Sequence, residues 1–240
     1  MNILVVNDDS VSAPGIAVLA GAAAEFGDVW VVAPAEQCSA MSQKLTLRDP
    51  MTLEQVSDFP APVKEAWKLG GTPVDCVKVG LIHILEEKPD WVLSGINNGY
   101  NAGFDIAYSG TLGAAFEAVR NGIPAMAFSI RSEAHLKNAE DCLRNLLKEL
   151  LEKDPGRGNV WNVNIPGMKE GNPRGILYDR KVAPVSMYQE QYIKTVHTDG
   201  TVTLLTHGIP TKDEDIPEGS DAAAVRNGYV SVGKVSCGVL

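Results

Sequence analysis

Four polar residues in this 240-residue sequence could together hold a metal ion. Asp8, Asp9, Ser39 and Asn97 each come shortly after a run of apolar, mostly β-branched residues. Such runs are typical of parallel strands covered on both faces. Because the carboxyl ends of parallel strands meet at the edge where ligands bind, we expect the four side chains to share one crevice. Asp and Asn also cap helices and form turns, so a structural role is the alternative for the acidic pair.

Two adjacent carboxylates in a crevice favour a bound cation. Two like charges 4 Å apart repel by about 4 kcal/mol at an effective dielectric near 20, and a divalent metal would offset that repulsion. Carboxylate, hydroxyl and amide oxygens are ligands that Mg²⁺, Mn²⁺ or Ca²⁺ accept. A histidine-based mechanism has little support, since the histidines fall in predicted helices or in the C-terminal third. These are His83, His135, His197 and His207.

Ser109, Gly110 and Thr111 open a predicted small-residue helix and are the expected phosphate site. Free backbone N–H groups at a helix start, with two hydroxyl groups beside them, suit a phosphate. Helix capping is again the alternative. With a metal opposite this helix start, the predicted reaction is metal-assisted hydrolysis of a phosphate ester by a bound water.

Predicted strands and helices alternate along the chain, which indicates an α/β protein with a mostly parallel sheet. Pro14 near one helix start, Gly27 after its end and Thr72-Pro73 at another start are the boundary signals. Residues 44–66 are predicted to form an insertion of strands and loops. Strands are expected over 3–6, 29–34, 91–94, 125–129, 160–165 and 229–232, and helices over 16–27, 73–87, 112–121 and 135–153, with a short one after Ser220-Asp221.

The last third is interrupted by proline and has a different organisation. Residues 194–205, folded about Asp199-Gly200, predict a β-hairpin with a type I′ turn. Because an isolated hairpin is marginally stable, we expect it to pack on a second subunit. We therefore predict a core over 1–170 and a C-terminal extension over 171–240, with an oligomerisation hairpin and a tail that returns to the core.

Composition excludes several classes of protein. A net charge of -9 and a pI near 4.9 argue against binding a long nucleic acid. No apolar run reaches the roughly 18 residues of a membrane span. The sequence begins directly with a strand, so we expect no secretory signal and a cytoplasmic protein. The cysteines, too far apart for a zinc site or a disulfide framework, are expected to be reduced. They are Cys38, Cys76, Cys142 and Cys237.

Five motifs follow one another along the chain in a fixed order. They are Asn7-Asp8-Asp9, Ala13-Pro14-Gly15-Ile16, Gly71-Thr72-Pro73-Val74-Asp75, Ser94-Gly95-Ile96-Asn97-Asn98-Gly99 and Tyr108-Ser109-Gly110-Thr111. As an ordered set, these motifs resemble the SurE family, the stationary-phase survival proteins, over essentially the whole sequence. The resemblance implies a metal-dependent nucleoside 5′/3′-monophosphate phosphohydrolase, a phosphoric monoester hydrolase. It also implies a Rossmann-like three-layer core and a C-terminal part that reaches over a partner subunit.

The resemblance also implies residue roles. The family's metal ligands fall on Asp8, Asp9, Ser39 and Asn97, and its phosphate-contacting segment on Ser109-Gly110-Thr111. Asp8 is our candidate general base, with Asn97 and Ser109 as further candidate catalytic residues. We expect one divalent ion per subunit, Mg²⁺ or Mn²⁺, a nucleoside monophosphate substrate, and a homodimer or homotetramer.

The chain departs from the family's pattern at Ser10, where Gly is usual, and at Gln43, where many members have His. A third departure is Gly233-Lys234-Val235 in the tail. The main alternative class is a Mg²⁺-binding receiver-like signalling domain, or a nucleotide-binding module without turnover. A receiver domain would need a third Asp as phosphoacceptor, whereas the third strand here leads into Asn97. A receiver domain also needs only about half the length of this chain.

Overall fold

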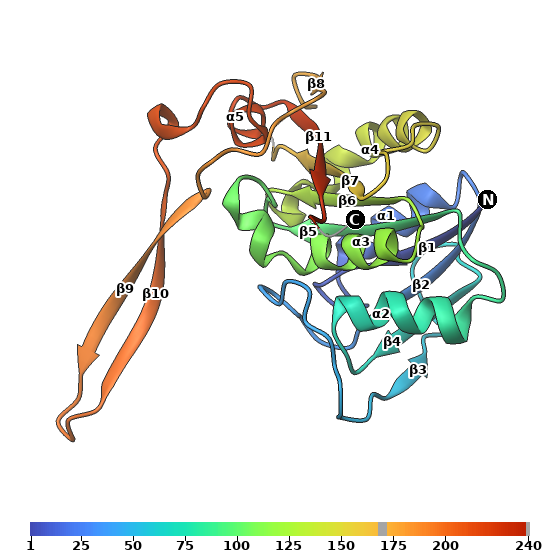
Figure 1. Ribbon diagram of the computed structural model, residues 1–240, viewed down its shortest axis with the longest axis horizontal. Coiled ribbons are helices and arrows are strands. Elements are labelled where there is room, and N and C mark those ends of the chain that lie inside the picture. Colours follow the sequence, from blue (N-terminus) through green and yellow to red (C-terminus); the bar gives the residue numbers. More distant parts are fainter. Residues whose placement is uncertain (168–171, 239–240) are drawn as a thin grey trace.

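The computed structural model describes residues 1–167 and 172–238, which form a layered α/β body and a long projecting hairpin (Figure 1). The strands of the main sheet are β1 Asn2–Val6, β2 Asp28–Pro34, β3 Leu53–Gln55, β4 Glu65–Leu69, β5 Trp91–Asn98, β6 Ala125–Ile130, β7 Asn159–Ile165, β8 Ile176–Leu177 and β11 Val230–Ser236. Among the described residues they form one nine-stranded sheet, in the order β3-β4-β2-β1-β5-β6-β7-β11-β8. From β4 to β7 every neighbouring pair is parallel, so the predicted fold class is confirmed.

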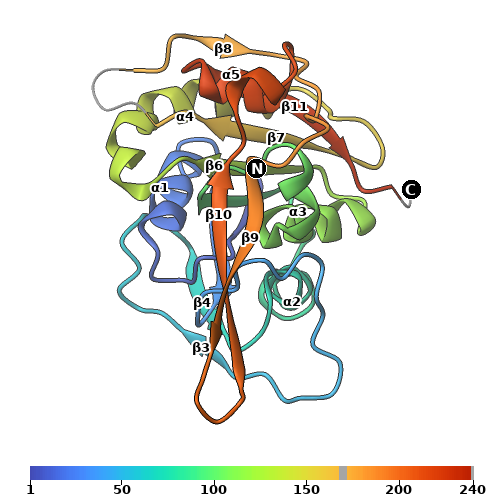
Figure 2. The same ribbon diagram turned by 90° about the vertical axis from the view of Figure 1, so that its left-hand side faces the viewer.

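Helices cover both faces of this sheet. They are α1 Pro14–Ala23, α2 Pro73–Val79, α3 Gly110–Arg120, α4 Leu136–Leu150 and α5 Asp221–Arg226. Figure 2 shows α1 and α4 on one side of the central strands and α2 and α3 on the other. Side chains of β1 alternate accordingly, because Ile3 and Val5 pack in the core under α1 and α4, whereas Leu4 and Val6 pack in the core under α2 and α3. A strand covered on both faces must be apolar throughout, as its sequence is.

The direction of the strand order changes at β1. Chain connections run outward from β1 through β2 to β4 on one side, and from β5 through β6 to β7 on the other. Loops that leave β1 and β5 therefore diverge, and in open α/β sheets this switch point is where ligands bind. Asp8 and Asp9 follow β1, and Asn97 lies at the end of β5.

Several helix signals are confirmed. Pro14 is the first residue of α1, and Thr72 and Asp75 form a reciprocal capping box at the start of α2. Gly27, however, does not cap α1, whose C-cap is Ala24. A Cβ on Gly27 would lie 2.1 Å from the carbonyl oxygen of Met1. Glycine is needed there because two backbone segments come into close contact.

Two boundary predictions were wrong. The helix expected over 73–87 continues after α2 only through a π-helical turn, Gly80–Ile84, and ends because Leu85 adopts an extended conformation. Residues 44–66 are not purely an insertion, since β4 begins at Glu65 and pairs parallel with β2. Only two of its five residues are buried, which is typical of a strand near the sheet edge, and its pattern is weaker than the continuous apolar runs of the central strands.

The predicted hairpin is present and is longer than expected. β9 Tyr188–Val196 and β10 Val202–Pro210 pair antiparallel and project from the body (Figure 1). The turn is not type I′, because Gly200 has a positive φ of 83° and Asp199 does not. Gly200 N–H donates to the His197 carbonyl, and His197 N–H donates to that of Thr201. These contacts define a three-residue loop with glycine at the left-handed position.

The C-terminal segments join the body through β11 and a small apolar core. This core consists of Ala102, Ala183, Met187, Ile216, Ala222 and Val225. β11 pairs antiparallel with β7 over Ser231–Ser236, the range that includes the departure Gly233-Lys234-Val235. Asp221 fixes this region, since its carboxylate accepts hydrogen bonds from the N–H groups of Gly103 and Ala183. The predicted boundary near residue 170 lies outside the described residues.

Gly15 tests how tightly α1 is held against the strand end. A Cβ at Gly15 would lie 2.2 Å from the carbonyl oxygen of Ile96 on β5. We expect Gly15→Ala to destabilise the protein by about 1–3 kcal/mol, because the helix must move away from the strand. Urea unfolding measures this change.

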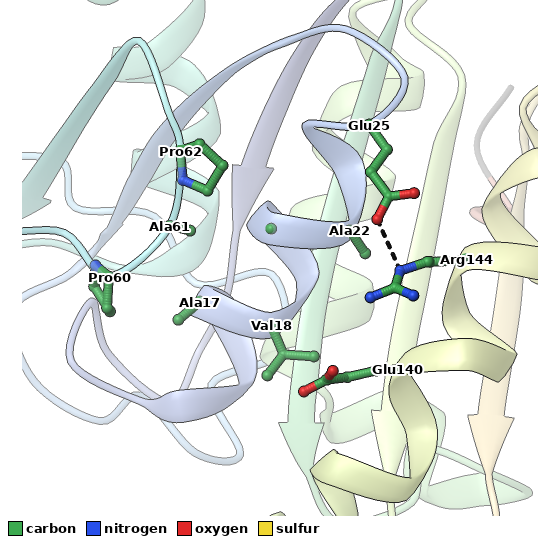
Figure 3. Close-up of a pocket in the computed structure, with 10 residues that line it drawn as sticks. Ala17, Val18, Ala22, Glu25, Pro60, Ala61, Pro62, Glu140 and Arg144 are labelled. Carbon is green, nitrogen blue, oxygen red and sulfur yellow. Dashed lines mark ion pairs between the residues drawn. The ribbon is translucent and has the colours of Figure 1, made fainter.

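Gly21→Ala in the same helix is the matched control. Its Cβ would lie 4.0 Å from the Ala61 Cβ, beside a surface pocket of about 340 Å³ between α1, residues 60–62 and α4 (Figure 3). Because nothing obstructs it, the higher helix propensity of Ala should stabilise the protein by about 0.5–1 kcal/mol. Equal effects of the two substitutions would contradict the close contact at Gly15.

Candidate functional site

Asp8 is the most constrained of the predicted site residues. It follows β1 directly and is only 4 % exposed. Its Oδ1 accepts a hydrogen bond of 2.8 Å from the hydroxyl of Thr111, at the start of α3. Its backbone carbonyl accepts one of 2.7 Å from Cys38 N–H, in the loop after β2. These two bonds bring three segments together at the sheet edge, as the sequence predicted.

Asp9 connects the same edge to β5. Its Oδ2 accepts a hydrogen bond of 2.8 Å from Asn98 N–H, and its Oδ1 accepts one of 3.3 Å from the side chain of Gln37. The neighbouring Asn97 donates through its side-chain nitrogen to the carbonyl of Gly99, at 2.8 Å. That bond fixes the amide orientation and leaves the Asn97 oxygen available as a ligand. Glycine suits position 99, where φ is 137°.

Ser39 is exposed and lies next to Cys38, whose N–H is bound to the Asp8 carbonyl. The structure therefore places Ser39 at the same edge, with its side chain open to solvent. Cys38 itself has a buried thiol, and burial raises its pKa. A thiol held in this neutral form is a poor nucleophile. The oxygen of Ser39, rather than the sulfur beside it, is the available ligand atom.

The start of α3 is in direct contact with Asp8. A Cβ on Gly110 would lie 3.0 Å from Asp8 Oδ2, so glycine lets the helix backbone approach the carboxylate. Ser109 is the N-cap, and its hydroxyl oxygen accepts from Leu112 N–H at 3.1 Å. Its own O–H proton stays available to a ligand. The capping role considered for these residues is thus present at Ser109, whereas the Thr111 hydroxyl donates to Asp8.

A buried asparagine network behind the site was not predicted. Asn101 is 6 % exposed, and its side-chain nitrogen donates to the hydroxyl oxygens of Thr111 and Ser129, at 3.2 and 2.9 Å. The carbonyl of Asn101 accepts from the side chains of Asn162 and Asn164 on β7. The available signal was the alternation of Asn with apolar residues in the predicted strand over 160–165. Buried polar side chains in a strand must be hydrogen-bonded, and so they mark a network.

The donor set fits a hard divalent cation. Among residues 1–167 and 172–238, no ion pair joins Asp8 or Asp9 to a Lys or Arg. The pKa of Asp8 is raised to about 6, chiefly by burial and also by the neighbouring carboxylate of Asp9, while the hydrogen bond from Thr111 opposes this rise. The described residues contain no cluster of three His, Cys, Asp or Glu side chains suited to a metal. A hydroxyl and an amide oxygen would complete the ligands.

Other sequence predictions are resolved by the contacts. Asp105 accepts a hydrogen bond of 3.0 Å from Met187 N–H, which is a structural role. Gln43 has a buried side-chain oxygen without a hydrogen-bond partner among the described residues.

His135 lies closer to the strand ends than expected. It closes a short 3₁₀ helix soon after β6, and Glu133 at the start of that helix donates its N–H to the side chain of Asn98.

The fold and these contacts define an α/β protein with an acidic, oxygen-lined site at the switch point of its sheet. The model of the family described as survival protein SurE matches residues 3–187. The chain belongs to this family, and the resemblance found in the sequence is confirmed.

Similar proteins support this assignment over nearly the full length. The chain is 40 % identical to a protein of Desulforamulus reducens named 5′-nucleotidase SurE, over 97 % of this chain and 91 % of that protein. It is 38 % identical to one of the same name from Synechococcus sp. (strain JA-3-3Ab), over 97 % and 90 %. The crystal structure of the SurE protein from Aquifex aeolicus superimposes with a TM-score of 0.84 at 33 % identity, covering 100 % of this chain and 95 % of that one.

Ser10, the departure next to the acidic pair, has a φ of 91°. A non-glycine residue held there costs about 1–3 kcal/mol, which explains why glycine suits the position. We expect Ser10→Gly to stabilise the protein by about 1 kcal/mol after allowing for the greater chain entropy of glycine. Ser10→Ala is the control. It also loses the 3.1 Å contact with the Ser12 hydroxyl but keeps the strain. Equal stabilisation by both in thermal unfolding would contradict this explanation.

Proposed function

We propose that this protein hydrolyses nucleoside 5′-monophosphates to nucleosides and phosphate, with one divalent metal ion per subunit, Mg²⁺ or Mn²⁺. The observation that carries the proposal is the 2.8 Å hydrogen bond between Thr111 and Asp8. It joins the carboxylate pair to a helix start suited to phosphate, so both requirements of the reaction meet at one point. The name 5′-nucleotidase SurE, given to the relatives, supports the same activity. Hydrolysis of 3′-monophosphates is part of the proposal.

Asp8, Asp9, Ser39 and Asn97 would hold the metal. When bound, a divalent ion neutralises charge on the phosphate and lowers the pKa of a water molecule. This chain's contribution is to keep the ligand oxygens oriented before the ion arrives. Asn98 N–H fixes Asp9, and the Gly99 carbonyl fixes the amide of Asn97. Orientation by such outer contacts commonly changes metal affinity 10- to 100-fold.

The start of α3 would bind the phosphate. Backbone N–H groups at a helix N-terminus point toward an anion, and the helix dipole favours negative charge. Ser109 can donate its hydroxyl proton to a phosphate oxygen, because its own oxygen already accepts the bond from Leu112. Gly110 keeps the helix backbone free of a side chain beside Asp8. Asp8 is then placed to accept the proton of the attacking water as the general base.

Metal-dependent phosphate release tests this function directly. The protein is assayed with a panel of nucleoside monophosphates in the presence of Mn²⁺ or Mg²⁺. We expect activity that EDTA abolishes, and an Asp8→Asn variant whose kcat/KM is lower by at least about 100-fold, because it loses a ligand charge and the base.

Asp28→Asn is the matched control, an acidic residue at the start of β2 that pairs with Lys64 on the surface. It should retain the kcat/KM of the unaltered protein. Phosphate release that persists in EDTA, or no release from any substrate of the panel, would overturn the proposal.

We also propose that the protein forms a homodimer or homotetramer through the hairpin. Every residue of β9 and β10 is exposed. The apolar side chains among them include the directly opposed pair Ile193 and Leu205, at 51 % and 65 % exposure. A lone two-stranded hairpin is marginal in water, and an apolar surface of this kind is typical of a protein–protein contact.

Light scattering coupled to size exclusion tests the assembly. The unaltered protein is expected to elute as a dimer or tetramer, and Ile193→Glu to shift it toward smaller species because a charge would be buried at the contact. Thr195→Glu, on the same strand but at a polar position, should have a smaller effect. A monomeric unaltered protein would rule out this assembly.

A further inference from the structure

We propose that Phe104 and Tyr108 form the platform on which the base of the nucleotide substrate stacks. This inference rests on the proposed function and adds a residue-level account of how the part of the substrate remote from the phosphate is bound. It concerns a cavity beside the metal and phosphate site that the proposed reaction itself does not use.

The cavity has a volume of about 1010 Å³ and lies between the 3₁₀ helix Phe104–Tyr108 and the stem of the hairpin. Two of its lining residues are direct chain neighbours of the proposed site. Ala40 follows Ser39, and Tyr108 precedes Ser109. A ligand whose phosphate lies at the start of α3 would therefore extend its other end into this cavity. Its size is ample for a base and a sugar.

The backbone of the platform is held on two sides. Phe104 N–H donates to the carbonyl of Val185, and Ser42 N–H donates to that of Tyr108. A side-chain bond runs from the Ser42 hydroxyl to the Ala107 carbonyl, at 2.9 Å. Figure 1 shows this segment beside the point where β9 leaves the body. The platform is thus positioned before a ligand binds, which lowers the entropy cost of binding.

The two aromatic rings are nevertheless left in solvent. Phe104 is 55 % exposed and Tyr108 is 61 % exposed, although the intervening Ile106 is buried. Single exposed apolar residues are common on protein surfaces. Here two rings from one fixed segment line the same cavity, and rings so placed suit stacking with a flat, uncharged group.

The charge of the cavity excludes a second anion as its occupant. Among the residues that the structure describes, its lining includes Asp105, Glu190 and Asp215 and no Lys or Arg. A phosphate would be repelled, whereas a neutral base can stack and donate hydrogen bonds from its amino groups to carboxylates. In this arrangement, the phosphate of the substrate is held at α3 and its base is held by the aromatic rings.

The test compares two substrates that differ in the base. AMP and ribose 5-phosphate carry the same phosphate ester, but only AMP has a base to stack. We expect Phe104→Leu and Tyr108→Leu each to lower the ratio of kcat/KM for AMP to that for ribose 5-phosphate by about 5- to 100-fold, the usual range for one base–aromatic stack. Tyr108→Phe keeps the ring and should retain most of the ratio. Ile82→Ala, an exposed apolar residue outside the cavity, should leave it unchanged.

Three outcomes would overturn the inference. One is a ratio that the two leucine variants leave unchanged while both remain folded by circular dichroism. Another is an equal loss with Tyr108→Phe, which would make the ring irrelevant. The third is a change of oligomeric state in the leucine variants, which would assign the rings to a subunit contact. Failure of the proposed function is distinguishable, since neither substrate would then release phosphate in the unaltered protein.

Discussion

The site depends on a carboxylate buried at the end of the central strand. Asp8 loses most of its contact with water because β1 is covered on both faces and α3 begins directly against it. A buried carboxylate beside a second one is costly unless its charge is compensated. One hydroxyl donor and a backbone contact position Asp8 and do not neutralise it. A cation at this edge would remove the cost, which is why the fold and the proposed chemistry are linked.

The asparagine network explains how the geometry is held without charge. Asn101 connects β7 to Thr111, and Thr111 connects to Asp8, so three strand ends and a helix start are joined by buried hydrogen bonds. A buried polar group left without its partner costs about 1–3 kcal/mol, so the members favour one arrangement. Because amides and hydroxyls are neutral, they orient the carboxylate and add no charge to compete with a metal for it.

Much of the fold was predictable because its signals are local. Continuous apolar runs marked the central strands, and Pro14 and Thr72-Pro73 marked helix starts. The parallel-sheet rule then brought Asp8, Asp9, Ser39 and Asn97 to one edge, and the structure places them there.

The errors arose where the decisive contact is distant in the sequence. Gly27 resembles the glycine that commonly ends a helix. Glycine is required there for another reason, because the backbone at position 27 comes into close contact with Met1. The role of Asn101 depends on β7, some sixty residues later, and no local pattern reveals that partner. Turn geometry at Asp199-Gly200 was misjudged for a different reason, since the same dipeptide also fits a three-residue loop. Contacts between segments distant in the sequence were therefore the part of the structure that could not be predicted.

The most direct test of the central claim is anomalous scattering from crystals of the protein grown with Mn²⁺. The account predicts one strong anomalous peak per subunit, in contact with oxygen atoms of Asp8, Asp9, Ser39 and Asn97. A well-ordered strand-end crevice with no peak, or a peak bound by other residues, would contradict it.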